Sequence, residues 1–144
     1  MQKIFLSILL GLTVISCSTS KKTSISTTDV PIEKYNSKKL KGYWELQMLF
    51  ASASKWNKTP YLILDQKEQT FSGNSGCNTI NGKFTTSGSF IAFDKNFTST
   101  KMACADNSEK EFLSTLQKVN KYTAANDELE LSQGEIVLMK FKRK

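Results

Sequence analysis

The sequence predicts a mainly β domain of the α+β type, a small curved antiparallel sheet or barrel of about eight strands with one α-helix. Short segments of alternating apolar and polar residues follow one another from Lys41 to the C-terminus, separated by turn residues. Short strands at close spacing are typical of sandwiches and barrels. A single helical pattern interrupts them near residue 110. We expect that helix to cover one side or one end of the sheet.

The expected strands begin with the first alternating segment. Trp44, Leu46 and Met48 alternate with polar residues, which is the pattern of a strand buried on one face. Similar short segments predict further strands at residues 61–64, 69–71, 83–86, 90–93, 128–131 and 136–141. Residues 97–104 are expected to be extended or irregular.

Glycine marks the expected turns between these strands. Gly73 and Gly76 predict a tight loop over residues 72–78, because glycine adopts backbone angles that other residues avoid. The pair Asn81-Gly82 predicts another turn, since this dipeptide is favoured in hairpins.

One helix is expected from about Ser108 to Asn120. Ser108 and Glu111 have the spacing of a capping box, in which the two side chains satisfy free backbone groups at the helix start. Four apolar residues recur at helical spacing and so share one face: Phe112, Leu113, Leu116 and Val119.

The N-terminus has the features of an export signal. Lys3 precedes an apolar run from Ile4 to Ile15, which is too short to span a bilayer that needs about 20 residues. The sequence Val14-Ile15-Ser16-Cys17 resembles a bacterial lipobox, so we expect residues 1–16 to be a lipoprotein signal peptide and Cys17 to carry lipid. A plain signal peptide with a chance cysteine, or the N-terminal helix of a cytosolic protein, is the alternative.

The rest of the chain is expected to form a linker and one domain. Residues 17–40 are rich in Ser, Thr, Lys and Asn, which is typical of a flexible tether, and residues 41–144 hold the domain. Ser18 and Thr19 give no acidic retention signal, so we expect a lipid-anchored protein of the cell envelope, in the outer membrane. The face on which it is displayed stays open.

Composition excludes several classes of function. The chain carries a net charge of +7, but its lysines are spread along it, so we expect no nucleic-acid partner. It contains no histidine, which excludes Ser-His-Asp and Cys-His catalysis and histidine-ligated zinc. We expect a protein that is not an enzyme and holds no cofactor or metal, and we expect it to be a monomer. A glycosidase-like pair stays open among four carboxylates in turns: Asp65, Glu68, Asp94 and Asp106.

Two cysteines remain after Cys17. In an exported chain without histidine, a disulfide between Cys77 and Cys104 is the default. It would stabilise the fold by about 3.5 kcal/mol in the chain-entropy model. The Gly-rich loop before Cys77 is a poor phosphate site, because it leads toward a strand rather than opening a helix.

The motifs around these cysteines resemble those of a known family. They are Gly42-x-Trp44-x-Leu46, Pro60-x-Leu62-x-Leu64, Ser72-Gly73 with Gly76-Cys77-Asn78, Gly82-x-Phe84 and Thr100-x-Met102-Ala103-Cys104. Over about residues 41–142 the chain resembles the META domain, the family of the heat-shock protein HslJ. The resemblance implies a compact antiparallel β fold with one helix, a place in the envelope and an association with stress or antibiotic tolerance. It implies no established enzymatic activity, and it makes the motif residues structural.

Two functions follow as hypotheses. The first is a non-enzymatic envelope protein that contacts another envelope protein, whose identity is unknown, or shields the envelope under stress. The second is a barrel that carries a small hydrophobic ligand or lipid, which requires an apolar internal pocket of roughly 300 Å³ or more. The strand aromatics are expected to fill the core, although a minority of them would line such a cavity: Trp44, Phe84, Phe90, Phe93 and Phe97.

Overall fold

The computed structural model describes residues 40–52, 56–104 and 107–144. The predicted signal peptide, Cys17, residues 17–39 of the predicted linker and Asp106 lie outside the described residues. No helix within the described ranges is long and apolar enough to cross a membrane.

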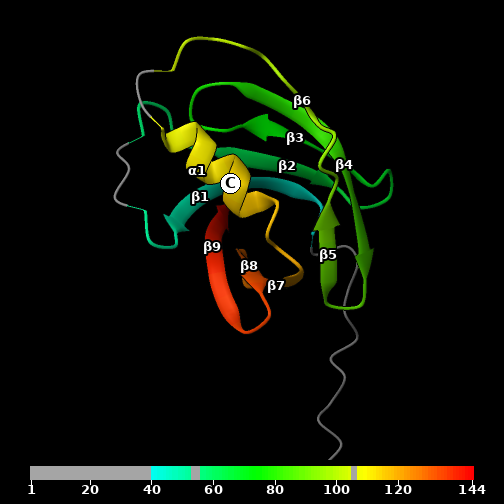
Figure 1. The fold of residues 1–144 in the computed structure, drawn as a ribbon. Coiled ribbons are helices and arrows are strands. Elements are labelled where there is room, and N and C mark those ends of the chain that lie inside the picture. Colours follow the sequence, from blue (N-terminus) through cyan, green and yellow to red (C-terminus); the bar gives the residue numbers. More distant parts are fainter. Residues whose placement is uncertain (1–39, 53–55, 105–106) are drawn as a thin grey trace, which may run out of the picture. The chain divides into compact units, whose positions relative to one another are not determined.

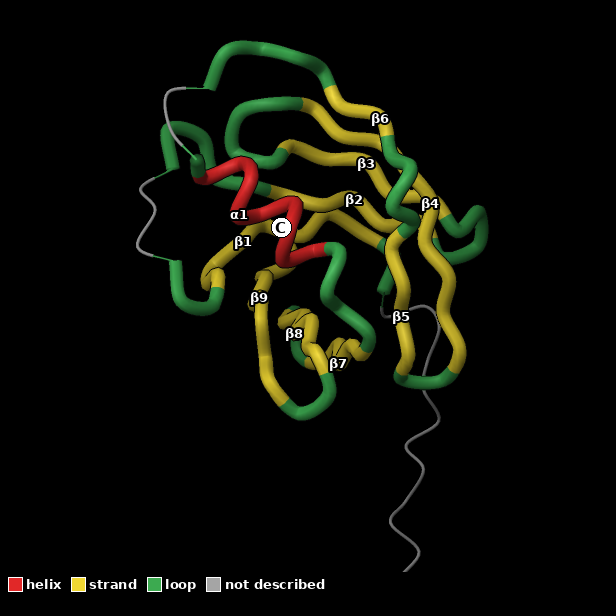
Figure 2. Tube along the Cα trace, in the orientation of Figure 1, coloured by secondary structure: helices red, strands yellow, loops and turns green. Residues whose placement is uncertain are grey.

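Nine strands and one helix follow one another along the described chain. They are β1 (Gly42–Leu49), β2 (Tyr61–Asp65), β3 (Thr70–Asn74), β4 (Thr79–Ser87), β5 (Phe90–Phe93), β6 (Thr98–Ser99), α1 (Ser108–Leu116), β7 (Lys121–Ala125), β8 (Glu128–Gln133) and β9 (Ile136–Arg143). Figure 1 shows their arrangement, and Figure 2 separates helix, strands and loops along the same trace.

Eight of the strands close into a ring. The antiparallel sheet runs in the order β3-β2-β1-β9-β8-β7-β5-β4, and a further pairing of β3 with β4 joins its two ends. The short strand β6 lies outside the ring and pairs with β4 alone. The structure is therefore a closed eight-stranded antiparallel barrel with one short helix, which confirms the predicted fold class.

The junction between β5 and β7 is the narrowest in the ring. It consists of one residue pair, Phe90 opposite Lys121, whereas β7 and β8 share a ladder from Lys121 to Ala125. The helix α1 packs beside β9 and contributes Phe112 and Leu116 to the core.

Large side chains fill the barrel interior. The biggest fully buried ones are Trp44, Phe84, Phe112 and Phe141. Trp44 donates its indole N–H to the carbonyl of Leu40 at 2.8 Å, so the polar atom of this buried ring is satisfied.

Two glycine predictions are wrong in an informative way. Asn81-Gly82 does not form a turn: both residues lie inside β4, where Gly82 pairs with Phe71. A Cβ on Gly82 would lie 2.6 Å from the Phe71 ring and 2.7 Å from Phe97 Cβ, so glycine is needed there for close packing. Gly73 likewise lies in β3 rather than in a loop, and a Cβ there would meet the Tyr61 carbonyl oxygen at 2.1 Å.

The helix begins at Ser108, as predicted, but its cap and its end differ from the prediction. The helix ends at Leu116, and its N-cap is Asn107, whose side chain makes no capping hydrogen bond. Ser108 is the first helical residue, so the predicted capping box is wrong. The Glu111 carboxylate instead accepts a hydrogen bond from Ser52 Oγ at 2.7 Å.

Three smaller differences concern the strands. A bulge between Leu46 and Met48 shifts the register of β1, so Leu49 rather than Met48 is buried. Strand β7 was not expected, because its sequence lacks a clear alternation. Phe90, expected in the core, is 59% exposed.

Candidate functional site

Asn78 lies where three separate segments meet. These are the loop of residues 75–78, the segment of residues 100–104 and the start of α1. Its side-chain oxygen accepts hydrogen bonds from Thr100 Oγ1 at 2.7 Å and from the Met102 backbone N–H at 2.8 Å. Its Nδ2 donates to Glu109 Oε2 at 2.8 Å. One buried amide therefore holds all three segments together.

Glu109 has both carboxylate oxygens engaged. Oε2 accepts from Asn78, and Oε1 lies 2.6 Å from the hydroxyl of Ser75, which is fully buried. The residue belongs to the first turn of α1, where a negative charge interacts favourably with the helix dipole. Because neither oxygen is free, Glu109 is placed to fix α1 against the loop rather than to act as a general base.

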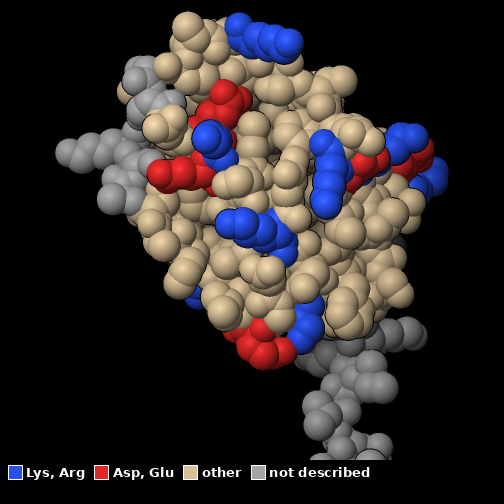
Figure 3. All heavy atoms as spheres, in the orientation of Figure 1, with Lys and Arg blue, Asp and Glu red and all other residues tan. Residues whose placement is uncertain are grey.

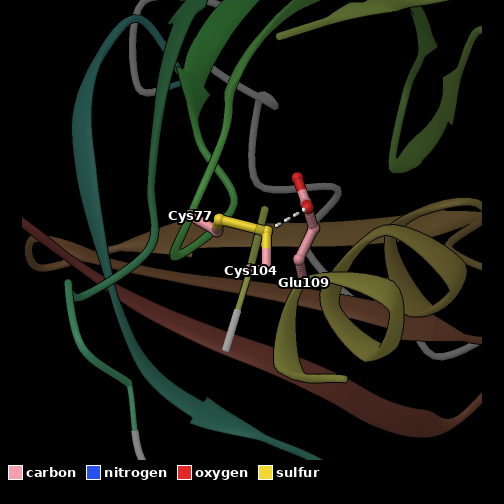
Figure 4. A group of neighbouring side chains, drawn as sticks. All are labelled: Cys77, Cys104 and Glu109. Atoms are coloured by element: carbon pink, nitrogen blue, oxygen red, sulfur yellow. Dashed lines mark hydrogen bonds between the residues drawn. A yellow bond between two sulfur atoms is a disulfide. The ribbon is translucent and has the colours of Figure 1, made fainter. Parts of the chain in front are cut away.

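Cys77 and Cys104 form a disulfide beside this network, with their Cα atoms 5.9 Å apart. Figure 4 shows the pair next to Glu109, whose Oε2 lies 3.0 Å from Cys104 Sγ. A disulfide sulfur carries no proton, so this is a close contact rather than a donated hydrogen bond. The ligand atoms of these three residues all lie within 4.8 Å of one another. In the disulfide form neither sulfur is a thiolate, which is the form that ligates metals.

The loop before the disulfide depends on Gly76. Its φ of +101° lies in the region that favours glycine, and a Cβ there would meet the Trp56 ring at 2.6 Å. Asn74 Oδ1 accepts a hydrogen bond from the Gly76 N–H at 2.9 Å. The predicted tight loop is therefore present, but it is confined to residues 75–78.

A groove of about 830 Å³ lies beside this network, and Asn78 and Glu109 are among its lining residues. The segment of residues 99–103 forms one wall and α1 forms the other. Phe97, Leu113 and Met102 supply apolar surface, and Met102 is 65% exposed. Lys101 and Lys110 also line the groove, and basic side chains are visible around α1 in Figure 3. We refer to this feature as the α1 groove.

The structure brings together some of the predicted site residues and separates others. Asn78, Thr100 and Met102 line the α1 groove, and the disulfide between Cys77 and Cys104 lies beside Asn78. Three other motif residues support the barrel wall instead: Gly42, Trp44 and Gly82. Sequence reasoning missed Ser75 and Glu109. The one available signal for Glu109 was its acidic side chain in the first helical turn, which does not reveal the loop it contacts.

Among the described residues, the candidate carboxylates do not form a buried pair suited to acid–base catalysis. Asp65 accepts backbone N–H bonds from Glu68 and Lys67 and pairs with Lys41, which together hold the pKa of its carboxyl below the usual range. Such a group is a poor general acid. Glu68 and Asp94 line the same shallow hollow, but both are exposed.

Comparison with known proteins places the fold. The sequence model of the META domain matches residues 38–144. A protein from Burkholderia xenovorans, solved by NMR, is similar at 21% identity and a TM-score of 0.58, covering 75% of this chain and 86% of that one. A crystal structure of a DUF4847 family protein from Bacteroides vulgatus is similar at 16% identity and a TM-score of 0.53, covering 73% and 94%. Among curated proteins, none matches significantly.

Proposed function

Because the chain belongs to the META domain family, we propose that it is a non-enzymatic protein of the cell envelope, anchored by lipid on Cys17, that binds another envelope protein through the α1 groove. The family membership and the barrel fold support this proposal.

The α1 groove is the observation that carries this proposal. Its two walls are neighbours in the chain, and Asn78, which is more than 20 residues from either, joins both: it bonds Thr100 and Met102 on one side and Glu109 on the other. The disulfide adds a covalent link at the end of the first wall. A recess whose walls are fixed before binding loses little conformational entropy when a partner arrives.

The polar groups of the site support binding rather than catalysis. The buried amide and carboxylate bond each other and their neighbours, so they stabilise the walls and leave no free nucleophile or base. The exposed lining combines two lysines, several hydroxyl and amide side chains and the apolar side chain of Met102, a mixture suited to recognising a protein surface.

The tether explains how such a domain would find its partner. Lipid on Cys17 would hold it at the membrane, and about 23 linker residues would let it move within roughly 25 Å as a random coil. The association with envelope stress or antibiotic tolerance, implied by the resemblance, fits a protein that braces or shields an envelope assembly.

Carriage of a hydrophobic ligand is the second candidate. This function requires an apolar pocket inside the barrel. Side chains such as Trp44, Phe84 and Phe141 occupy that interior. The apolar part of the α1 groove, with Phe97, Leu113 and Met102, is the surface that favours this candidate.

Site-specific crosslinking tests the proposal. We would place the photoreactive residue p-benzoylphenylalanine at position 102 in the full chain, in cells, with position 136 as the control. Met102 and Ile136 are similarly exposed, but Ile136 does not line the α1 groove. We expect one recurring protein adduct at position 102 and none at position 136. Equal adducts at both positions, or none at either, would contradict the proposal.

Mass spectrometry tests the anchor separately. We expect the mature chain to begin at Cys17 with added diacylglycerol, and Cys17→Ser to release the protein from membranes. Recovery of an unmodified chain that still contains residues 1–16 would rule the anchor out.

A further inference from the structure

The segment that follows β5 has one backbone edge in use. Thr98 and Ser99 pair with Asn81 and Ile80 of β4. The Thr100 N–H continues this edge by donating to the Thr79 carbonyl at 3.1 Å. Two residues further on, Met102 bonds Asn78 through both its N–H, at 2.8 Å, and its carbonyl, at 3.4 Å.

The alternation of backbone groups along an extended chain determines the direction in which the N–H and C=O groups of the other residues in this segment point. In an extended chain, the N–H and C=O of neighbouring residues face opposite sides. Since Thr100 and Met102 face β4 and Asn78, the backbone groups of Ser99, Lys101 and Ala103 face away from them. These three residues are exposed, and the backbones of Lys101 and Ala103 have no hydrogen-bond partner among the described residues. Residues 100–103 continue from β6 (Thr98–Ser99) without belonging to a strand themselves, and the segment of residues 99–103 presents a free backbone edge.

That free edge lines the α1 groove. The groove contains the whole segment on one side and Lys110, Leu113 and Gln117 of α1 on the other. A space of about 830 Å³ beside a free edge can take an extended peptide, whose side chains would alternate between the groove and solvent. Phe97, Leu113 and Met102 provide apolar contacts for the side chains that point inward.

Charge defines the occupant further. Lys101 and Lys110 line the groove and have no acidic partner among the described residues. The one acidic side chain of the groove lining, Glu109, already has its oxygens engaged by Asn78 and Ser75. An acidic segment therefore fits this surface. A second copy of the chain fits poorly, because pairing two such edges would bring Lys101 near another Lys101.

We propose that the free edge of residues 99–103 binds an extended acidic peptide segment of a partner protein by β-strand addition. Backbone hydrogen bonds to Ser99, Lys101 and Ala103 would supply affinity. Apolar residues at alternate positions would enter the groove, and acidic residues would meet Lys101 and Lys110. This inference rests on the proposed function and names the kind of partner it requires.

The test uses the full mature chain and synthetic peptides as probes. The first peptide alternates glutamate and valine, the second alternates lysine and valine, and the third is the acidic peptide with N-methyl groups along one backbone edge. We expect the acidic peptide to bind at least about tenfold more tightly than either of the others, a difference of about 1.4 kcal/mol. Equal binding of the acidic peptide and its N-methylated form would overturn strand addition.

Protein variants locate the binding. Ala103→Pro removes an N–H that is free in this structure, so it should weaken the acidic peptide about tenfold with little change in stability. The double variant Lys101→Glu/Lys110→Glu should reverse the preference toward the lysine peptide. Lys83→Glu is the matched control, because Lys83 lines a different hollow, and it should leave binding unchanged. If Lys83→Glu weakened binding of the acidic peptide as much as the groove variants do, the peptide would not bind specifically in the α1 groove.

The outcome also separates this inference from the proposed function. If position 102 crosslinks a recurring envelope protein but no acidic peptide binds, the strand-addition inference fails and the proposed function stands. If neither is seen, both fail.

Discussion

Asn78 and Glu109 are 31 residues apart in the chain, yet their side chains meet at 2.8 Å in a half-buried network. The contact joins the loop after β3 to the first turn of α1. The same Asn78 side chain also holds Thr100 and Met102. One amide thus joins both walls of the α1 groove, and Phe112 and Leu116 also hold α1 against the core.

Replacing Asn78 should destabilise the protein strongly. Asn78→Ala leaves the Met102 N–H, the Thr100 hydroxyl and the Glu109 carboxylate short of a partner, so we expect a loss of about 2–4 kcal/mol of unfolding free energy, measured by urea denaturation. Thr100→Ala removes one of these bonds and should cost about 1 kcal/mol. Equal losses for the two variants would contradict the central role of Asn78.

Removing the disulfide should weaken the protein without unfolding the barrel. The double variant Cys77→Ala/Cys104→Ala should lose about 3 kcal/mol, since the closed loop no longer restricts the unfolded chain. The Asn78 hydrogen bonds to Thr100, Met102 and Glu109 do not require the sulfur atoms, and the barrel ladders lie elsewhere, so β-sheet circular dichroism should remain. Hydrogen exchange should rise chiefly at the Met102 amide. A global loss of sheet signal would show that the disulfide is required for folding itself.

Glycine substitutions should separate close packing from backbone conformation. Gly82→Ala forces a methyl group against Phe71 and Phe97, so we expect a loss of about 1–3 kcal/mol. Gly134→Ala meets no atom within 4 Å but has a φ of +59°, so it should cost about 1 kcal/mol through the backbone alone. We therefore expect the melting temperature to fall further for Gly82→Ala than for Gly134→Ala. A larger fall for Gly134→Ala would contradict this prediction.

Asp65 should make stability depend on acidity. Backbone N–H bonds from Glu68 and Lys67 and the ion pair with Lys41 lower the pKa of its carboxyl in the folded state. Its contribution is therefore present above the ordinary aspartate pKa and is lost as the pH falls through the lowered folded pKa. Urea denaturation across the acidic range should show a shallower decline for Asp65→Asn. Parallel curves for the variant and the wild type would exclude this contribution.

The sequence predicted the barrel because its strands carry a local signal. In β8, Leu129 and Leu131 alternate with glutamates, and both leucines are fully buried. The bulge in β1 gave no such signal, because it depends on how β1 pairs with β9. The turn predicted at Asn81-Gly82 was wrong for a related reason. The sequence alone does not distinguish a glycine that forms a turn from a glycine that packs against an aromatic ring, as Gly82 does against Phe71.

Only part of the candidate site could be predicted from the sequence. The motif around Cys77 and Asn78 identified one side of the network, and the Thr100 and Met102 motif identified another. Ser75 and Glu109 joined them only through tertiary contacts that no spacing encodes. The α1 groove could not be predicted either, because its walls are held together by the contacts of Asn78 and by the packing of α1 on the core, and no local sequence pattern encodes these.

Ring closure also bears on aggregation. A protein concentrated on a membrane meets its own copies often, and sheets with long open edges then tend to pair and precipitate. Here each barrel strand pairs with neighbours on both sides, so little backbone is available for such growth except at the junction of β5 with β7, which is a single residue pair. The short β6 and the extended segment after it are exceptions, and the lysine at position 101 places a repelling charge on that edge. The same charge that would select an acidic partner therefore also acts as a gatekeeper against self-assembly.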